Sequence, residues 1–164
     1  MSVDTIEKLF VDELKDLYSA EKQITKALPK LAKASTSEDL RDAFESHLKE
    51  TQGQIERLEQ IFSILEVSPR GKTCAGMKGL LEEGSEVLEE AEEGAVRDAA
   101  MISAAQRVEH YEMAGYGSVR TYAELLGKDK IVTLLQKTLE EEKSADSKLT
   151  HIAQSVNEDA LRAA

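Results

Sequence analysis

The chain has 164 residues, of which 41% are hydrophobic and only 4% aromatic. This length and composition predict a single all-helical domain over residues 1–164 that can bury its own core. A net charge of −11 repels phosphate backbones and anionic lipids, which argues against nucleic-acid and membrane partners. The chain has one cysteine and lacks the basic and apolar segments of a signal peptide at its start, so we expect a cytoplasmic protein.

Apolar residues recur at steps of three and four residues in four long segments, which is the pattern of amphipathic helices. The first segment opens at Asp4, where Glu7 has the spacing of a capping box, and continues past Leu31. The second follows the Ser-Thr-Ser run at 35–37, which suits a helix N-terminus, and ends at Leu65. Because only a short link joins them, we expect these two helices to form an antiparallel hairpin.

A different stretch, residues 66–94, separates this hairpin from the other two long segments. It starts with a proline and a glycine, carries a shorter helical pattern over 74–92, and is rich in glutamates that we expect to be solvated. A third helix is predicted over about 96–126 and a fourth after Asp129, again joined by a short link. Two hairpins connected by one long crossover form the ferritin-like topology, an antiparallel four-helix bundle.

Carboxylates interrupt the apolar stripes near the middle of all four long helices. An unpaired carboxylate in a core is costly to ionise, so several together require cations. On the first hairpin, Glu21 and Glu50 are equally far from the turn at residues 35–36. Residues equally distant from a hairpin turn lie at the same height, so these two side chains are predicted to meet.

The second hairpin has the same symmetry. Glu112 and Glu142 are equally far from Gly127, and Glu109 precedes Glu112 by one turn on the same helix face. Two further polar side chains lie one turn beyond the glutamates of the second and fourth helices, at the edge of the layer. The predicted metal-binding set is Glu21, Glu50, Gln54, Glu109, Glu112, Glu142 and Asp146.

A plainer interpretation is that these residues are surface charges, or a buried network paired with lysine or arginine. The middle of the apolar stripes contains no lysine or arginine, however, which favours a metal as the countercharge. Facing carboxylates of this kind build dinuclear sites in bundle cores. His47 is expected either to support a ligand or to pack in the core, whereas His110 and His151 are expected to lie outside the site.

Four stretches resemble the YciF-type bacterial stress proteins: LYSAEKQ at 17–23, HLKETQGQ at 47–54, VEHYE at 108–112 and EEEK at 140–143. The likeness covers nearly the whole chain. Because that family belongs to the ferritin-like superfamily, the resemblance implies the bundle fold, a homodimer and a carboxylate metal site. It implies no particular reaction.

The resemblance also implies roles for individual residues. Glu21, Glu50 and Glu142 match the glutamates of the first, second and fourth ferritin-like helices. On the third helix, Glu109 and Glu112 resemble the glutamate pair of rubrerythrins.

Two departures from the superfamily pattern affect the expected metal. Where histidines usually follow the glutamates of the second and fourth helices, this chain has Gly53 and Ala145, with Gln54 and Asp146 as substitutes one position later. The resulting oxygen-rich set suits two iron ions, with manganese or another divalent metal, such as calcium or magnesium, as alternatives.

Three functions are compatible with these features. The first is a small oxidoreductase of the rubrerythrin type, with iron or manganese, that reacts with peroxide or oxygen. It would need an external reductant, because the chain lacks a set of electron-carrying cysteines. The second is a non-catalytic dimeric stress or interaction protein whose metal staples the core, and the third is iron storage.

Overall fold

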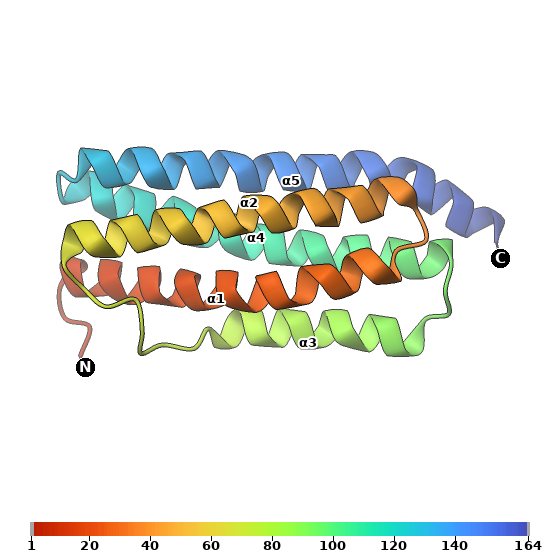
Figure 1. The fold of residues 1–164 in the computed structure, drawn as a ribbon, viewed down its shortest axis with the longest axis horizontal. Coiled ribbons are helices and arrows are strands. Elements are labelled where there is room, and N and C mark those ends of the chain that lie inside the picture. Colours follow the sequence, from red (N-terminus) through yellow and green to blue (C-terminus); the bar gives the residue numbers. More distant parts are fainter. Residues whose placement is uncertain (1, 164) are drawn as a thin grey trace.

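The computed structural model describes residues 2–163 and contains five α-helices (Figure 1). They are α1 (Ile6–Ala34), α2 (Glu38–Leu65), α3 (Ala75–Glu90), α4 (Ala95–Leu125) and α5 (Asp129–Arg162). No strand occurs in the part of the chain that the structure describes. The four long helices and the short crossover helix agree closely with the predicted ranges, so the all-helical fold is confirmed.

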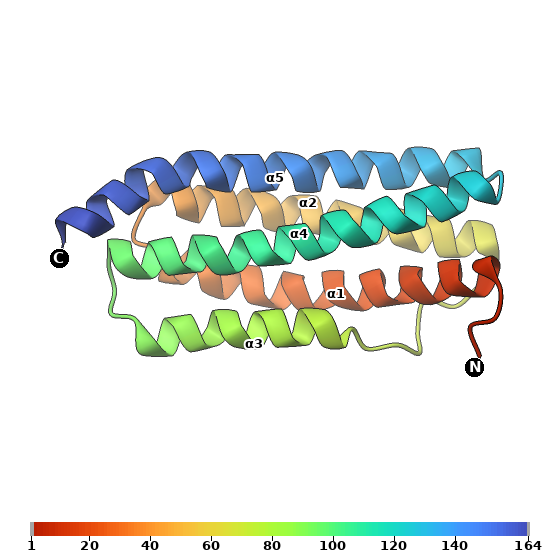
Figure 2. The same ribbon diagram turned by 180° about the vertical axis from the view of Figure 1, so that it is seen from behind.

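The long helices form two antiparallel hairpins, α1 with α2 and α4 with α5, that lie side by side (Figures 1 and 2). Helix α3 runs along the outside of the bundle against α1 and α4 and leaves the α2–α5 side uncovered. The crossover therefore returns the chain along the length of the bundle, which is the ferritin-like connection. Within residues 2–163, no helix combines the length and apolarity needed to cross a membrane.

Hydroxyl groups begin the first two helices. The N-cap of α1 is Thr5 and not the predicted Asp4, because the Thr5 hydroxyl is the oxygen that accepts the Lys8 backbone N–H. Asp4 pairs instead with the Lys8 ammonium at 2.6 Å. The N-cap of α2 is Ser37, as predicted, and its hydroxyl accepts the Leu40 N–H.

Asp98, at the start of α4, connects the two hairpins at one end of the bundle. Its buried carboxylate accepts hydrogen bonds from the backbone N–H groups of Thr36 and Ser37, at 3.0 and 2.7 Å. The neighbouring Arg97 donates to the carbonyl of Ala34 at 2.8 Å. These contacts satisfy backbone groups in the α1–α2 turn and fix the position of α4 relative to it.

The core consists of two apolar clusters at opposite halves of the bundle. One cluster, which includes Leu14 and Leu135, lies in the half where α1 and α5 begin. The other, which includes Leu28 and Ile152, lies in the half covered by α3. The apolar stripes of all four long helices are interrupted between these clusters, and the polar layer occupies that gap.

The start of α3 is held by a tyrosine of α4. The hydroxyl of Tyr111 donates to Asp16 on α1 at 2.6 Å and lies 3.0 Å from the thiol of Cys74, the N-cap of α3. The Tyr111 hydroxyl therefore joins α1 to the start of α3. Its ring lies so close to Gly76 that a Cβ there would sit 2.6 Å from Cε2.

This close approach predicts opposite effects of alanine at two glycines of α3. Gly76→Ala should destabilise the protein by about 1–2 kcal/mol, because the rigid ring of Tyr111 must move. Gly79→Ala, with nothing within 4 Å of its new Cβ, should stabilise it by about 1 kcal/mol through helix propensity. Urea unfolding of both variants would measure the difference, and equal effects would show that the ring contact is unimportant.

Candidate metal centre

Four buried carboxylates meet in the middle of the bundle, between the two apolar clusters. Glu21 comes from α1, Glu109 and Glu112 from α4, and Glu142 from α5, and none is more than 3% exposed. Glu21 lies beside Glu112. Glu112 and Glu142 lie in one layer, as the symmetry of the second hairpin predicted, whereas the first hairpin contributes Glu21 without its predicted partner Glu50.

Helix α2 contributes a histidine to this cluster, at the level where the sequence predicted Glu50. One ligand atom from each of His47, Glu109, Glu112 and Glu142 can be chosen so that all four lie within 4.8 Å of one another. The His47 Nε2 atom is 3.1 Å from Glu109 Oε1 and 3.6 Å from Glu142 Oε2. Its other ring nitrogen, Nδ1, lies 3.2 Å from Glu50 Oε2. His47 therefore belongs to the cluster itself.

Most carboxylate oxygens in the cluster have no hydrogen-bond partner. Both oxygens of Glu112 and of Glu142 are buried and unpartnered, as is one oxygen each of Glu21 and Glu109. The second Glu21 oxygen accepts a hydrogen bond from the hydroxyl of Tyr116. Across residues 2–163, these four carboxylates form no ion pair with lysine or arginine, only with the imidazole. Buried carboxylates without donors or positive neighbours are costly, and bound cations would remove that cost.

Burial and mutual repulsion raise the pKa of three of these carboxyl groups. Burial outweighs the hydrogen bond from Tyr116 and raises the pKa of Glu21 to about 7. Burial, together with the negative charge of Glu142, raises the pKa of Glu112 well above its usual value. Burial and the neighbouring Glu109 do the same for the pKa of Glu142. At neutral pH the metal-free cluster therefore retains protons.

His47 and Glu109 behave as a pair. Burial lowers the pKa of His47, but its contacts with Glu109 and Glu50 outweigh burial and raise that pKa well above its usual value. Burial also acts to raise the pKa of Glu109, yet the contact with His47 reverses this and lowers it. The imidazole is therefore protonated in the metal-free protein, and a metal would displace that proton.

Glu50 is not brought into the buried cluster. Its side chain is 43% exposed, and it touches the cluster only through His47. On α2 the two residues are one turn apart on the same face, and the histidine takes the inward position while Glu50 reaches the surface. The proposed role of Glu50 as a ligand stays a prediction.

Gln54 is fully buried but is held by neighbours outside the cluster. Its amide nitrogen donates to Glu141 at 3.2 Å, and its carbonyl oxygen has no hydrogen-bond partner. Glu141 is fixed in turn by two hydrogen bonds from Arg57, at 2.6 and 2.7 Å. The free carbonyl oxygen makes Gln54 available as a ligand, which also stays a prediction.

Asp146 faces the seam between α4 and α5. It accepts a hydrogen bond from Gln106 at 3.3 Å and lies 3.3 Å from the exposed imidazole of His110. The side chain of Asp146 is 21% exposed, and its contacts are with Gln106 and His110 on the surface of α4. The structure places Asp146 at a partly exposed edge of the bundle, and its role as a ligand stays a prediction.

The donor set is chemically suited to divalent metal ions. Carboxylate oxygens with one imidazole are the ligands that iron and manganese share in proteins. The sequence had suggested an all-oxygen set, and His47 adds the nitrogen that this set lacked. The observation that could have revealed His47 is its place on the same stripe as Glu50, one turn earlier.

An antiparallel bundle with a buried carboxylate–histidine cluster between its long helices defines the ferritin-like class of proteins. Residues 5–161 match the family described as a domain of unknown function, DUF892, and the chain belongs to that family. It is 53% identical over 154 residues to Protein YciF of Escherichia coli K12, with 93% of each chain covered.

Solved structures agree with this assignment. The crystal structure of the E. coli stress protein YciF superposes with a TM-score of 0.92 at 50% identity, covering 95% of this chain and 99% of that one. A Rhodopseudomonas palustris protein gives 0.86 at 48% identity, covering 92% and 97%. A Bacillus anthracis protein described as ferritin-like and diiron-carboxylate gives 0.70 at 17% identity, covering 93% and 99%. This last likeness shows the shared fold.

The raised pKa values predict that the metal-free protein loses stability as pH rises from about 5 to 8. Folding holds protons on Glu21, Glu112, Glu142 and His47 that the unfolded chain releases in this range, so rising pH favours unfolding. For Glu21 alone the loss is on the order of 3 kcal/mol. Because the pKa of Glu109 is lowered, this group stabilises the fold above pH 4.5, and its contribution to stability is lost as the pH falls below that value.

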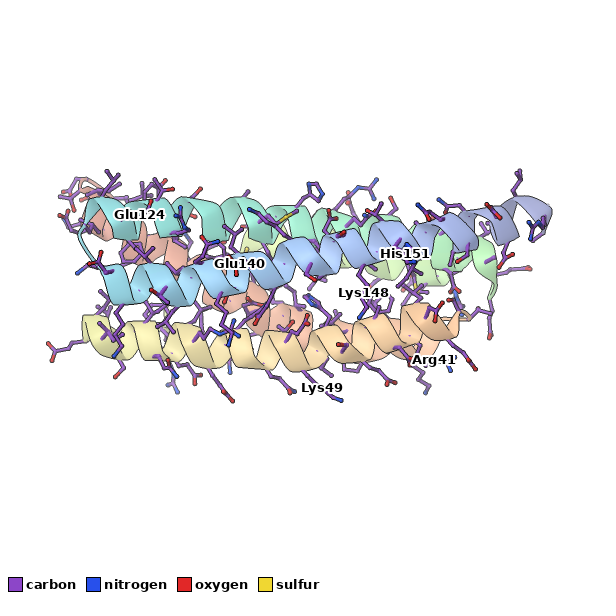
Figure 3. The ribbon with its side chains drawn as sticks, turned by 90° about the horizontal axis from the view of Figure 1, so that it is seen from above. Arg41, Lys49, Glu124, Glu140, Lys148 and His151 are labelled. Atoms are coloured by element: carbon purple, nitrogen blue, oxygen red, sulfur yellow. The ribbon has the colours of Figure 1, made fainter. Side chains whose placement is uncertain are left out.

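Urea unfolding in the presence of a chelator at several pH values would measure this slope. Glu112→Gln removes one titrating group from the cluster and should flatten the slope. Glu140→Gln makes the same substitution on the exposed side of α5 (Figure 3) and should leave the slope unchanged. Stability that stays constant or increases from pH 5 to 8 would contradict the proton-holding cluster.

Proposed function

We propose that this protein binds two divalent metal ions, iron or manganese, at the buried cluster, and that it acts as a stress-related oxidoreductase toward peroxide or oxygen. The observation that carries the proposal is the set of buried, unpartnered carboxylate oxygens on three helices, joined by an imidazole from the fourth. The stress role is inferred from the E. coli relative, which is described as a stress protein.

The ligands would come from all four long helices. Glu21, Glu109, Glu112 and Glu142 would supply oxygen atoms, and His47 would supply Nε2 after losing its proton. Glu50, Gln54 and Asp146 are proposed as additional ligands or as residues that orient the first set. The Tyr116 hydroxyl, which donates to one Glu21 oxygen, would fix the direction of that carboxylate.

A pair of iron or manganese ions held there would supply redox chemistry toward peroxide or oxygen. The chain itself would manage the protons. Glu50 is half-exposed and touches His47 Nδ1, so it would hold the Nδ1 proton and keep Nε2, beside Glu109, directed at the metals. Electrons would come from an external reductant, because the chain has one cysteine and that cysteine is buried.

Metal binding is the first expected outcome. Protein purified without metal should bind two Mn²⁺ or Fe²⁺ per chain, and saturation should raise its melting temperature by about 5–10 °C, since metal binds the folded state. Replacing Glu109 or Glu142 with alanine should abolish two-metal binding. His110→Ala and His151→Ala are matched controls, because both imidazoles are exposed, and they should bind like the wild type.

Stoichiometry by elemental analysis and melting by circular dichroism would make these measurements. If the wild type binds neither ion and its melting temperature does not respond to either, the carboxylate layer is purely structural. The oxidoreductase proposal would then fail with it.

Turnover and assembly separate this function from its two alternatives. The metal-loaded protein, supplied with a reductant, should consume hydrogen peroxide, and Glu142→Ala should consume none. Light scattering should show a homodimer. Metal binding without consumption of peroxide or oxygen would indicate a non-catalytic dimer whose metal only stabilises the core. A closed assembly of twelve or more chains would indicate iron storage.

A further inference from the structure

A cavity of about 70 Å³ lies between α2 and α5 and opens onto one edge of the carboxylate cluster. Its walls are largely apolar and come from all five helices. They include Ile24, Leu28, Phe44, Leu81, Val108 and Leu149. Leu31, which also lines it, is ten residues beyond Glu21 on α1, or about 15 Å along the helix. The cavity therefore extends along the bundle beyond the carboxylate layer in which the proposed metals would lie.

The inner end of the cavity is polar. His47 and Glu109 line it there, each at least nine-tenths buried. The Nε2 atom of His47 approaches Glu109 Oε1 but is not aligned for a hydrogen bond, and Glu109 Oε2 has no partner. In the metal-free protein, two buried polar atoms therefore remain available where the apolar walls end.

The outer end of the cavity is formed by short side chains and one lysine. Ser46 on α2 and Ser144 and Ala145 on α5 line it, and their small side chains take up little of its volume. Lys148 stands between α5 and α2 at the rim, on the side of the bundle that α3 does not cover (Figure 3).

Size and charge restrict what this cavity can accept. An apolar cavity of roughly 150 Å³ holds benzene, so about half that volume suits a chain of a few carbon atoms. An anion would meet the buried Glu109 at the inner end, where the His47 imidazole is already paired with Glu109 and Glu142. A cation would have to pass the Lys148 ammonium and cross apolar walls without a countercharge.

We propose that this cavity is a binding site for a small uncharged organic molecule, with an apolar body of about three carbon atoms and one hydroxyl-like end directed at His47 and Glu109. The site deepens the proposed function, because it would bring an organic substrate to the edge of the metal centre. Its test needs neither metal nor turnover, so its failure and the failure of metal binding can be distinguished.

The probe is n-propanol, titrated into the metal-free protein and followed by NMR of the methyl groups of Val108 and Leu149 and of the His47 ring nitrogens. Saturable shifts in all three residues are expected, with a Kd on the order of millimolar for a ligand of this size. Propionate and propylammonium, which have the same length but carry charges, should bind at least tenfold more weakly.

Two variants fill the cavity from opposite helices, Ala145→Leu on α5 and Ser46→Leu on α2, and each should abolish the shifts. Ala160→Leu makes the same change on α5 away from the cavity and should leave propanol binding intact. Circular dichroism shows which variants fold, and either filling variant is sufficient for the comparison. Absence of saturable shifts, equal binding of either ion, or unchanged binding in a folded filling variant would overturn the proposal.

Discussion

Repulsion among four buried carboxylates is the interaction around which this bundle is organised. Glu21, Glu109, Glu112 and Glu142 share a volume in which water cannot solvate them, and among residues 2–163 only His47 offers them a positive charge. In water such groups would repel only weakly, but burial strengthens the repulsion several-fold. A fold selected for stability alone would place leucines there. The surrounding structure therefore has to hold these groups together, and the metal-free cluster retains protons that limit their repulsion.

Two apolar clusters, one on each side of the polar layer, perform that task. Each cluster joins side chains from all four long helices, so the layer is clamped from both ends of the bundle. Additional polar contacts outside the polar layer also hold the helices together. The Arg57–Glu141 pair links α2 to α5, and Asp98 joins α4 to the α1–α2 turn. The crossover helix covers α1 and α4, and the uncovered α2–α5 side is where short side chains leave a cavity.

The sequence predicted the helices, the hairpins and the burial of five glutamates, of which four are buried, because helical periodicity is local and hairpin symmetry determines height. It did not distinguish His47 from Glu50. Both lie on one face of α2, and which of them points inward depends on how α2 is rotated against its neighbours, a property of packing. The contact of Gln54 with Glu141 joins residues 87 apart in the chain, and no local pattern signals it.

The division of the cluster between two hairpins has a consequence for the order of folding. Each hairpin closes over a short turn and can form from local contacts, which are fast. The first hairpin carries only Glu21 and His47 of the cluster, whereas the second carries the remaining three carboxylates. These groups become buried only when the two hairpins dock, so most of the electrostatic cost is incurred in that step. We expect docking of the two hairpins to be the slow step of folding. Divalent ions should speed it, because they bind carboxylates from both hairpins.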